Sequence, residues 1–359
     1  MADIEHARKI INEVDAQMAQ LFVRRMQAAE EVAAYKKERG LPILDAAREK
    51  AVLAAGAERM ENPIYRSYYT NFLQEIMEIS KRYQHRLTEG MRVAFSGVKG
   101  AFADIAARGI FPDAECVPYP DFASAYEAVE SGACDCAVLP IENSYNGDVG
   151  QVMDLAFFGD LHIHQVCEVE IVQNLLAVKG TTMDEVKTVI SHPQALGQCA
   201  GYIRKHGFAT KEAVNTAIAA EEVARAGRHD LAAIGSDEAA QAFGLKKLEA
   251  HINESSGNTT RFAVFSRVAK TPDLADNQFV MAFTVNNEAG SLGKAIEVIG
   301  ANGFNLRALK SRPTKKLCWS YYFYVEGDGN IYGVQGQKML GELMQCCNNV
   351  RLLGSFAKE

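Results

Sequence analysis

The sequence has no apolar run of the length that a membrane-spanning helix needs. It begins Met-Ala-Asp-Ile-Glu-His, which leads directly into a charged helical pattern and contains no apolar signal region. We therefore expect a cytoplasmic protein without a membrane partner. The chain also has no excess of positive charge, because its 359 residues include 38 Lys and Arg but 45 Asp and Glu. A nucleic-acid partner is therefore not expected.

The sequence also lacks the cysteine spacing of a disulfide-bonded protein or of a metal site. The eight cysteines lie in a chain without an export signal and are expected to be reduced thiols. Cys134/Cys136 and Cys346/Cys347 lack a second ligand pair at the spacing of a zinc site. We expect no metal and no cofactor. The apolar fraction of 48% is that of a globular protein, long enough here for two or three domains.

The first region, residues 1–88, is predicted to be all-α. Apolar residues recur with helical period over Asp3–Arg39, until Gly40-Leu41-Pro42 interrupts the pattern. A second helix is expected over Asp45–Asn62 and a third over Ile64–Gln84. A first helix of this length would protrude unless a second copy covered it, which favours a homodimer.

The second region, residues 91–270, is predicted to be α/β. Short apolar runs alternate with helical stretches, which indicates mainly parallel sheets covered on both faces. In such folds ligands bind where strands end and helices begin. The expected strands include Arg92–Phe95, Cys136–Leu139 and Leu231–Ile234, and the expected helices include Phe122–Ser131 and Thr216–Ala226.

The third region, residues 278–357, is predicted to be α+β with the order βαββαβ. Its strands are expected near Phe279–Val285, Phe304–Arg312, Trp319–Glu326 and Val350–Ser355, and its helices near Ser291–Asn302 and Val334–Cys346.

Polar residues recur at one-face spacings in the helical region. Arg25 and Lys36 are eleven residues apart, close to three full turns. Arg8 lies seventeen residues before Arg25, which is about 25 Å along the axis, so it can share a ligand with Arg25 only from an antiparallel second copy. The other two helices carry comparable sets: Asp45, Arg48 and Glu49, then Ser80 and Gln84. Taken alone, these stripes also fit solvated faces with ion pairs along the helices.

In these positions the first region resembles a chorismate mutase of the all-helical kind, whose two chains intertwine as a dimer. The resemblance implies that Arg25 and the second copy's Arg8 hold the carboxylates of chorismate. It places Lys36 and Gln84 at the ether oxygen as the catalytic residues. Arg48 and Ser80 would support the carboxylates, while Asp45 and Glu49 position the ring hydroxyl.

Four short motifs follow the strands of the second region: Gly97–Phe102, Pro140–Ser144, Ser191–Ala195 and Asn258–Phe262. Each alone fits an ordinary turn. In this order they resemble prephenate dehydratase, a two-lobed α/β fold similar to the periplasmic binding proteins. The resemblance implies that Thr260 is catalytic and that Arg261 binds a carboxylate of prephenate. The other expected substrate-binding residues are Asn143, Ser144, Gln194, Thr216 and Phe262.

The first of these motifs departs from the dehydratase pattern. Val98 stands where the family has proline, and Ala101 and Ala103 replace hydroxyl residues. These departures argue against hydrogen bonds from the side chains of this loop to substrate, whereas its backbone amides are unaffected.

The third region resembles the ACT domain, an amino-acid-binding module that mediates feedback inhibition by phenylalanine in this family. The expected effector-binding residues are Gly290, Ser291, Leu292, Ser311, Arg312 and Pro313. Gly293 and Lys310 depart from the family motifs, and Lys310 replaces a glutamate. An assembly module that has lost its effector is the alternative.

Taken together, the chain resembles the bifunctional chorismate mutase/prephenate dehydratases of phenylalanine synthesis. An arogenate dehydratase and a non-catalytic amino-acid sensor remain as alternatives. A fused prephenate dehydrogenase is excluded, because Gly97-Val98-Lys99-Gly100 lacks the spacing of a dinucleotide fingerprint.

Overall fold

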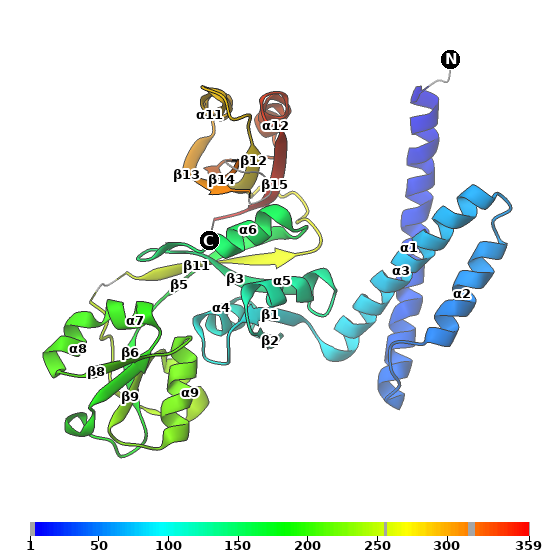
Figure 1. The fold of residues 1–359 in the computed structure, drawn as a ribbon. Helices are drawn as coiled ribbons and strands as arrows, with labels where there is room; N and C mark the ends of the chain where they lie inside the picture. Colours follow the sequence, from blue (N-terminus) through cyan, green and yellow to red (C-terminus); the bar gives the residue numbers. More distant parts are fainter. Residues whose placement is uncertain (1–3, 255–256, 315–319, 359) are drawn as a thin grey trace. The chain divides into compact units, whose positions relative to one another are not determined.

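The structure is a computed structural model that describes residues 4–254, 257–314 and 320–358. Contacts divide the chain into two compact units, Met1–Met91 and Arg92–Glu359. Figure 1 shows the helical unit in blue to cyan and the second unit in green to red. Within the described residues, no helix is both long and apolar enough to cross a membrane.

The helical unit consists of α1 (Ile4–Arg39), α2 (Ala46–Glu58) and α3 (Pro63–Glu89), as predicted. Asp45 caps α2 by accepting a hydrogen bond from the Arg48 amide, and Asn62 caps α3 ahead of Pro63. The third helix is longer than expected, because the polar segment after Gln84 continues it until Gly90 adopts φ 86°.

The second unit contains two sheets that form two lobes. The first lobe has the strand order β2-β1-β3-β11-β5, with the short β4 (Gly147–Asp148) beside β3. Its other elements are β1 (Arg92–Ser96), α4 (Phe102–Ile110), β2 (Glu115–Tyr119), α5 (Phe122–Glu130), β3 (Cys136–Asn143), α6 (Gly150–Phe158), β5 (His162–Glu170) and β11 (Thr259–Ser266).

The second lobe has the strand order β10-β6-β9-β7-β8. Its elements are β6 (Asn174–Ala177), a 3₁₀ turn (Met183–Glu185), β7 (Thr188–Ser191), α7 (Pro193–Gln198), α8 (Ala200–His206), β8 (Ala209–Glu212), α9 (Thr216–Ala226), β9 (Leu231–Gly235), α10 (Asp237–Phe243) and β10 (Lys246–Glu249).

The expectation of mainly parallel sheets was wrong, because both sheets are mixed. Strand β11 runs antiparallel to β3 and β5, and β6 runs antiparallel to β9 and β10. The chain passes from the first lobe to the second after β5 and returns before β11. These connections are not helical crossovers within one sheet, so they do not impose parallel pairing.

The last region has the predicted βαββαβ order. Its elements are β12 (Gln278–Thr284), α11 (Ser291–Ala301), β13 (Asn305–Pro313), β14 (Tyr321–Asp328), α12 (Val334–Cys346) and β15 (Asn349–Phe356). The sheet order is β13-β14-β12-β15, and all of its pairings are antiparallel. The expected start of the third strand, Trp319, lies outside the described residues.

The sheet of the last region is buried on both faces. In β12, Phe279, Met281 and Phe283 pack with the two helices, while the alternate residues Val280 and Ala282 join the core of the first lobe. A side chain at Gly354 of β15 would overlap the Ile163 backbone of β5. This close packing holds the edge strand β15 against the first lobe.

Candidate functional site

The helical unit brings Arg25 and Ser80 together. The Arg25 guanidinium donates hydrogen bonds to the Ser80 hydroxyl and to the Ile76 carbonyl at 3.1 Å. Burial lowers the pKa of Arg25. Gln84 lies one turn further along α3 and is 8% exposed, and its Oε1 has no hydrogen-bond partner among the described residues.

Other predicted residues of this unit make separate contacts. Lys36 Nζ contacts the Ile43 carbonyl at 2.5 Å, and Glu49 pairs with Lys81 at 3.0 Å. Lys81 was missed by the sequence reasoning, although it follows Ser80 directly. Arg8 is exposed and pairs with Glu5 on its own helix. Within one chain Arg8 therefore does not reach Arg25.

A cavity of about 570 Å³ lies between the two lobes of the second unit. Both lobes contribute to its wall, and five predicted residues line it: Asn143, Gln194, Thr216, Thr260 and Phe262. Phe102 and Phe122 give the cavity further aromatic surface. Its size and its mixture of apolar and polar groups suit one small organic ligand.

Thr260 and Asn143 form the polar centre of this cavity. They face each other on the paired strands β11 and β3, and Asn143 Nδ2 donates to Thr260 Oγ1 at 2.9 Å. Asn143 is itself fixed, because its Oδ1 accepts hydrogen bonds from the backbone amides of Tyr145 and Asn146. Since the amide donates to Thr260, the threonine proton remains available for another acceptor.

His192 and two glutamines complete the polar wall on the second lobe. The backbone N–H of Gln194 donates to His192 Nδ1 at 3.3 Å, so the neutral ring carries its proton on Nε2. Burial lowers the pKa of His192. Gln173 donates to Gln198 at 3.4 Å, and its own Oε1 is buried without a partner among the described residues. His192 directly follows β7 and Gln173 directly precedes β6, and these places at strand ends are the signal that could have identified the two residues.

No Lys or Arg lines the cavity within the part of the chain that the structure describes. Helix N-termini face it instead, because the first residues of α4, α6 and α9 are Phe102, Gly150 and Thr216, all of which line the wall. Unpaired backbone amides and the helix dipole make such ends favourable for anions.

Two predicted residues of the second region do not line the cavity. Ser144 closes a turn by donating to the Gly257 carbonyl and accepting from the Thr259 amide. Arg261 lies between Thr260 and Phe262 in β11 and therefore points to the opposite face of the strand. The structure thus does not place Arg261 where a substrate carboxylate would reach it.

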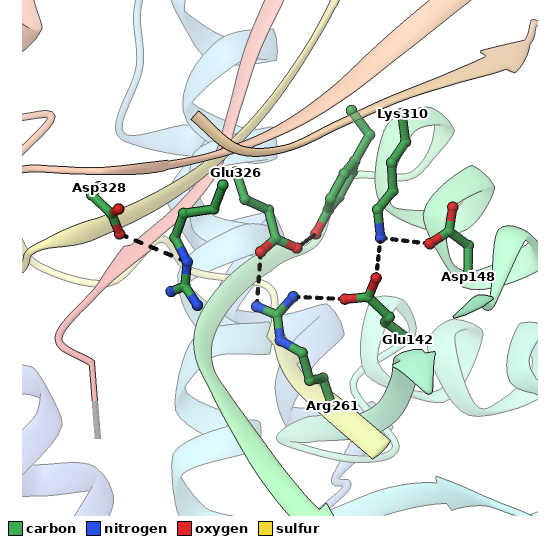
Figure 2. Close-up of polar contacts among 8 residues, drawn as sticks. Glu142, Asp148, Arg261, Lys310, Glu326 and Asp328 are labelled. Carbon is green, nitrogen blue, oxygen red and sulfur yellow. Dashed lines mark hydrogen bonds and ion pairs between the residues drawn. The ribbon is translucent and has the colours of Figure 1, made fainter. Parts of the chain in front are cut away.

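Arg261 instead belongs to an ion-pair network with the last region (Figure 2). It contacts Glu142 at 3.0 Å and Glu326 of β14 at 2.8 Å. Lys310 of β13 contacts Glu142 at 2.8 Å and Asp148 at 2.5 Å. Burial would raise the pKa of Glu142, but hydrogen bonds from Lys310 and Arg261 outweigh it and lower that pKa.

The expected effector-binding residues occupy two elements of the last region. Gly290, Ser291 and Leu292 form the start of α11, and Ser311, Arg312 and Pro313 end β13. Arg312 is engaged within the chain, since its guanidinium binds Asp154 of α6 at 2.8 and 3.0 Å. Tyr322 donates to the same carboxylate at 2.7 Å.

Comparison with known proteins assigns two regions of the chain to families. Residues 93–270 match the family model described as prephenate dehydratase, and residues 7–85 match chorismate mutase type II. An arogenate dehydratase/prephenate dehydratase of Arabidopsis thaliana is 33% identical over 282 residues, which cover 74% of this chain and 72% of the relative. The chain belongs to the prephenate dehydratase family.

Within that family, the helical region places the chain with the bifunctional members. The bifunctional chorismate mutase/prephenate dehydratase of Aquifex aeolicus is 29% identical over 369 residues, covering 100% of this chain and 99% of the relative. The crystal structure of prephenate dehydratase from Arthrobacter aurescens, solved in complex with L-Phe, is 26% identical. It matches 75% of this chain and 90% of its own chain with a TM-score of 0.70.

Proposed function

We propose that the chain converts chorismate to prephenate in its helical unit and prephenate to phenylpyruvate in the cavity of its second unit. The observation that carries this proposal is the hydrogen bond between Asn143 and Thr260 in the cavity of the second unit. In the helical unit, the contact of Arg25 with Ser80 and the burial of Gln84 support the first reaction. The functional regions of this proposal are residues 1–88, 91–270 and 278–357, and the family models over residues 7–85 and 93–270 support the first two.

The first reaction needs no acid, base or nucleophile. It requires a compact substrate conformation and stabilisation of the charge that develops on the ether oxygen. Arg25 with Ser80 binds one carboxylate, and Arg48 supports it. Lys36 and Gln84 donate to the ether oxygen, while Asp45 and Glu49 position the hydroxyl. Gln84 is 8% exposed and follows Ser80 by one helical turn, and its Nε2 is the atom that donates.

The helical unit acts as an intertwined homodimer. Only Ala29 and Ala33 of α1 are buried within one chain, although the helix carries a series of exposed apolar residues. Six of these are Ile4, Ile11, Val14, Met18, Leu21 and Val23, each more than 40% exposed. Such a surface favours burial against a second copy. Arg8 then completes the partner's site.

The second reaction breaks two bonds of prephenate. The electron pair of the bond to the ring carboxylate moves into the ring as carbon dioxide leaves, and the C–O bond breaks at the opposite ring carbon. Thr260 donates a hydrogen bond to the departing oxygen, which leaves as hydroxide and becomes water by taking a proton from solvent. Asn143 aligns Thr260 for this donation, since its amide occupies an acceptor position of the hydroxyl.

The two carboxylates of prephenate are bound by neutral groups of the cavity wall, among whose described residues there is no Lys or Arg. The helix N-termini at Phe102, Gly150 and Thr216 supply backbone amides, and His192 donates from Nε2. The loss of hydroxyls at Ala101 and Ala103 does not affect this mode of binding, because backbone amides are present whatever the side chain.

The last region is an ACT domain that binds phenylalanine between two copies and inhibits the dehydratase. Support comes from its βαββαβ order and from the L-Phe complex of the Arthrobacter relative. Titration of each activity against phenylalanine tests this. If phenylalanine neither binds by calorimetry nor slows the dehydratase, the last region serves assembly alone.

Incubation of the purified chain with chorismate, without nicotinamide or added metal, tests the whole proposal. Prephenate should accumulate first and phenylpyruvate should follow. The alternative substrate is arogenate, which the Arabidopsis relative's name includes. A chain that converts arogenate but not prephenate would establish that alternative.

A further inference from the structure

Lys310 connects the last region to two carboxylates of the dehydratase lobe. Its ammonium contacts Asp148 Oδ1 at 2.5 Å and Glu142 Oε1 at 2.8 Å, and Figure 2 shows it between the two acidic groups. The Lys310 side chain is 14% exposed, whereas that of Asp148 is 40% exposed. A partly buried pair of this kind is screened less by water and salt than a surface pair.

Both carboxylates belong to the wall of the substrate cavity or lie next to it. Asp148 lines the cavity, on the segment between β3 and α6. Glu142 precedes Asn143, the residue that holds Thr260. Lys310 itself does not line the cavity. The cation therefore acts on substrate through the charge of Asp148 and not by direct contact.

A second contact fixes Lys310 in this position. Two residues further along β13, Arg312 binds Asp154 of α6, and a side chain at Gly150 would overlap its guanidinium. Gly150 and Asp148 lie on the same cavity wall. Residues 310 and 312 point to the same side of the strand, so β13 anchors this wall at two points.

The two possible substrates, prephenate and arogenate, differ at a group whose charge would interact with that of Asp148. Prephenate has two carboxylates and a 2-oxo group, whereas arogenate has the same carboxylates and an ammonium. A free Asp148 would repel the dianion and attract the ammonium. Paired with Lys310, Asp148 presents little net charge to the cavity.

We propose that Lys310 is a specificity-determining residue of the dehydratase, which pairs with Asp148 at the cavity wall, reduces the negative charge there and thereby favours the 2-oxo dicarboxylate over the amino-acid substrate. This inference rests on the proposed dehydratase function. It gives Lys310 a role at the cavity of its own chain, through Asp148, and not a role in effector binding.

The test compares kcat/KM for prephenate and for arogenate in the native chain, Lys310→Met, Lys310→Arg and Arg307→Met. Arg307 is a matched control, because it lies on β13 and pairs with Asp328 at 3.8 Å, away from the cavity residues. The prephenate/arogenate ratio should fall about tenfold in Lys310→Met, the scale expected when one charge beside a partly buried site is uncovered. The ratio should be largely restored in Lys310→Arg and unchanged in Arg307→Met.

Two further measurements distinguish an electrostatic effect of Lys310 from a purely structural one. The shift in Lys310→Met should shrink as salt is added, and the double variant Lys310→Met/Asp148→Asn should recover the native ratio. If Lys310→Met does not fold, Asp148→Asn alone should raise the ratio. An equal loss for both substrates, or an unchanged ratio, would overturn the inference. Failure of the native chain to convert either substrate would instead overturn the proposed function.

Discussion

The side-chain amide of Asn143 donates to the hydroxyl of Thr260 across 2.9 Å, between two strands whose residues are 117 positions apart in the chain. This contact orients the hydroxyl toward the cavity. Thr260→Val keeps the shape of the side chain and removes only the donor. We expect the dehydratase kcat to fall about a hundred- to a thousandfold, as for loss of one preorganised donor.

Two controls belong to this measurement. Thr259→Val changes the neighbouring hydroxyl of β11, which does not line the cavity, and should leave the dehydratase kcat near the native value. Mutase activity of Thr260→Val reports whether the chain is intact. Full dehydratase activity in Thr260→Val would remove Thr260 from the mechanism.

Lys36→Met should produce the opposite pattern. The ammonium lies beside the Ile43 carbonyl in the helical unit, which the contacts separate from the second unit. In the proposed mechanism its loss removes an electrostatic donor to the ether oxygen, worth about 3–4 kcal/mol or roughly a hundred- to a thousandfold in mutase rate. Chorismate and prephenate assays on the same preparation should show loss of the first activity only. Equal loss of both would contradict separate sites.

The sequence predicted most elements of this fold because its helices and strands have strong local signals. Asp45, Asn62-Pro63 and Gly90 cap or terminate the first helices. A continuous apolar run marks β12, and alternating burial marks β13. The direction of β6 and β11 was not predictable from such signals, because it depends on how the chain passes between the lobes.

The site was predictable where the family motif and the strand period agree. Thr260 and Phe262 line the cavity, and the same alternation places Arg261 on the other face, a consequence that the sequence alone could have shown. By contrast, Lys310 and Asp148 are 162 residues apart, and their contact follows from the packing of the last region on the first lobe. No local pattern encodes such a pair.

The folding stability of the second unit should depend on the protonation of His192. Burial lowers its pKa in the folded protein, so between the folded and unfolded pKa values the unfolded chain binds more protons. Stability should therefore fall as the pH drops from about 7 to about 5. His192→Asn preserves a side-chain acceptor for the cap of α7 and should reduce this loss. Denaturant unfolding of both proteins across this pH range measures the difference, and equal slopes would contradict it.

Gly290 and Gly293 provide a matched test of the start of α11. A Cβ at either position would meet no atom within 4 Å, but Gly290 has φ 87° and Gly293 lies in the first helical turn. Gly293→Ala should stabilise the last region by about 0.5–1 kcal/mol, whereas Gly290→Ala should destabilise it by about 1–2 kcal/mol. Hydrogen exchange of peptides from residues 278–357 should show opposite changes in protection. Changes of the same sign would mean that the backbone conformation at Gly290 does not decide the outcome.

Mixing two inactive chains tests whether Arg8 acts on the second copy's site. Arg8 pairs with Glu5 and lies about 25 Å along α1 from Arg25, too far to share one ligand within a chain. Arg8→Ala and Arg25→Ala should each lose mutase activity as homodimers. In a heterodimer, one site carries both substitutions and the other site carries neither. Statistical exchange makes about half of the dimers mixed, so about a quarter of native activity should return.

The dehydratase of the same mixture supplies the internal standard, because neither substitution lies in the second unit. Native mass spectrometry of chains that carry different mass labels would measure the heterodimer fraction directly. Recovery in proportion to that fraction would show that each site takes Arg25 from one copy and Arg8 from the other. If heterodimers form and mutase activity stays absent, Arg8 does not complete the partner's site, and the exposed apolar residues of α1 are then explained by assembly alone.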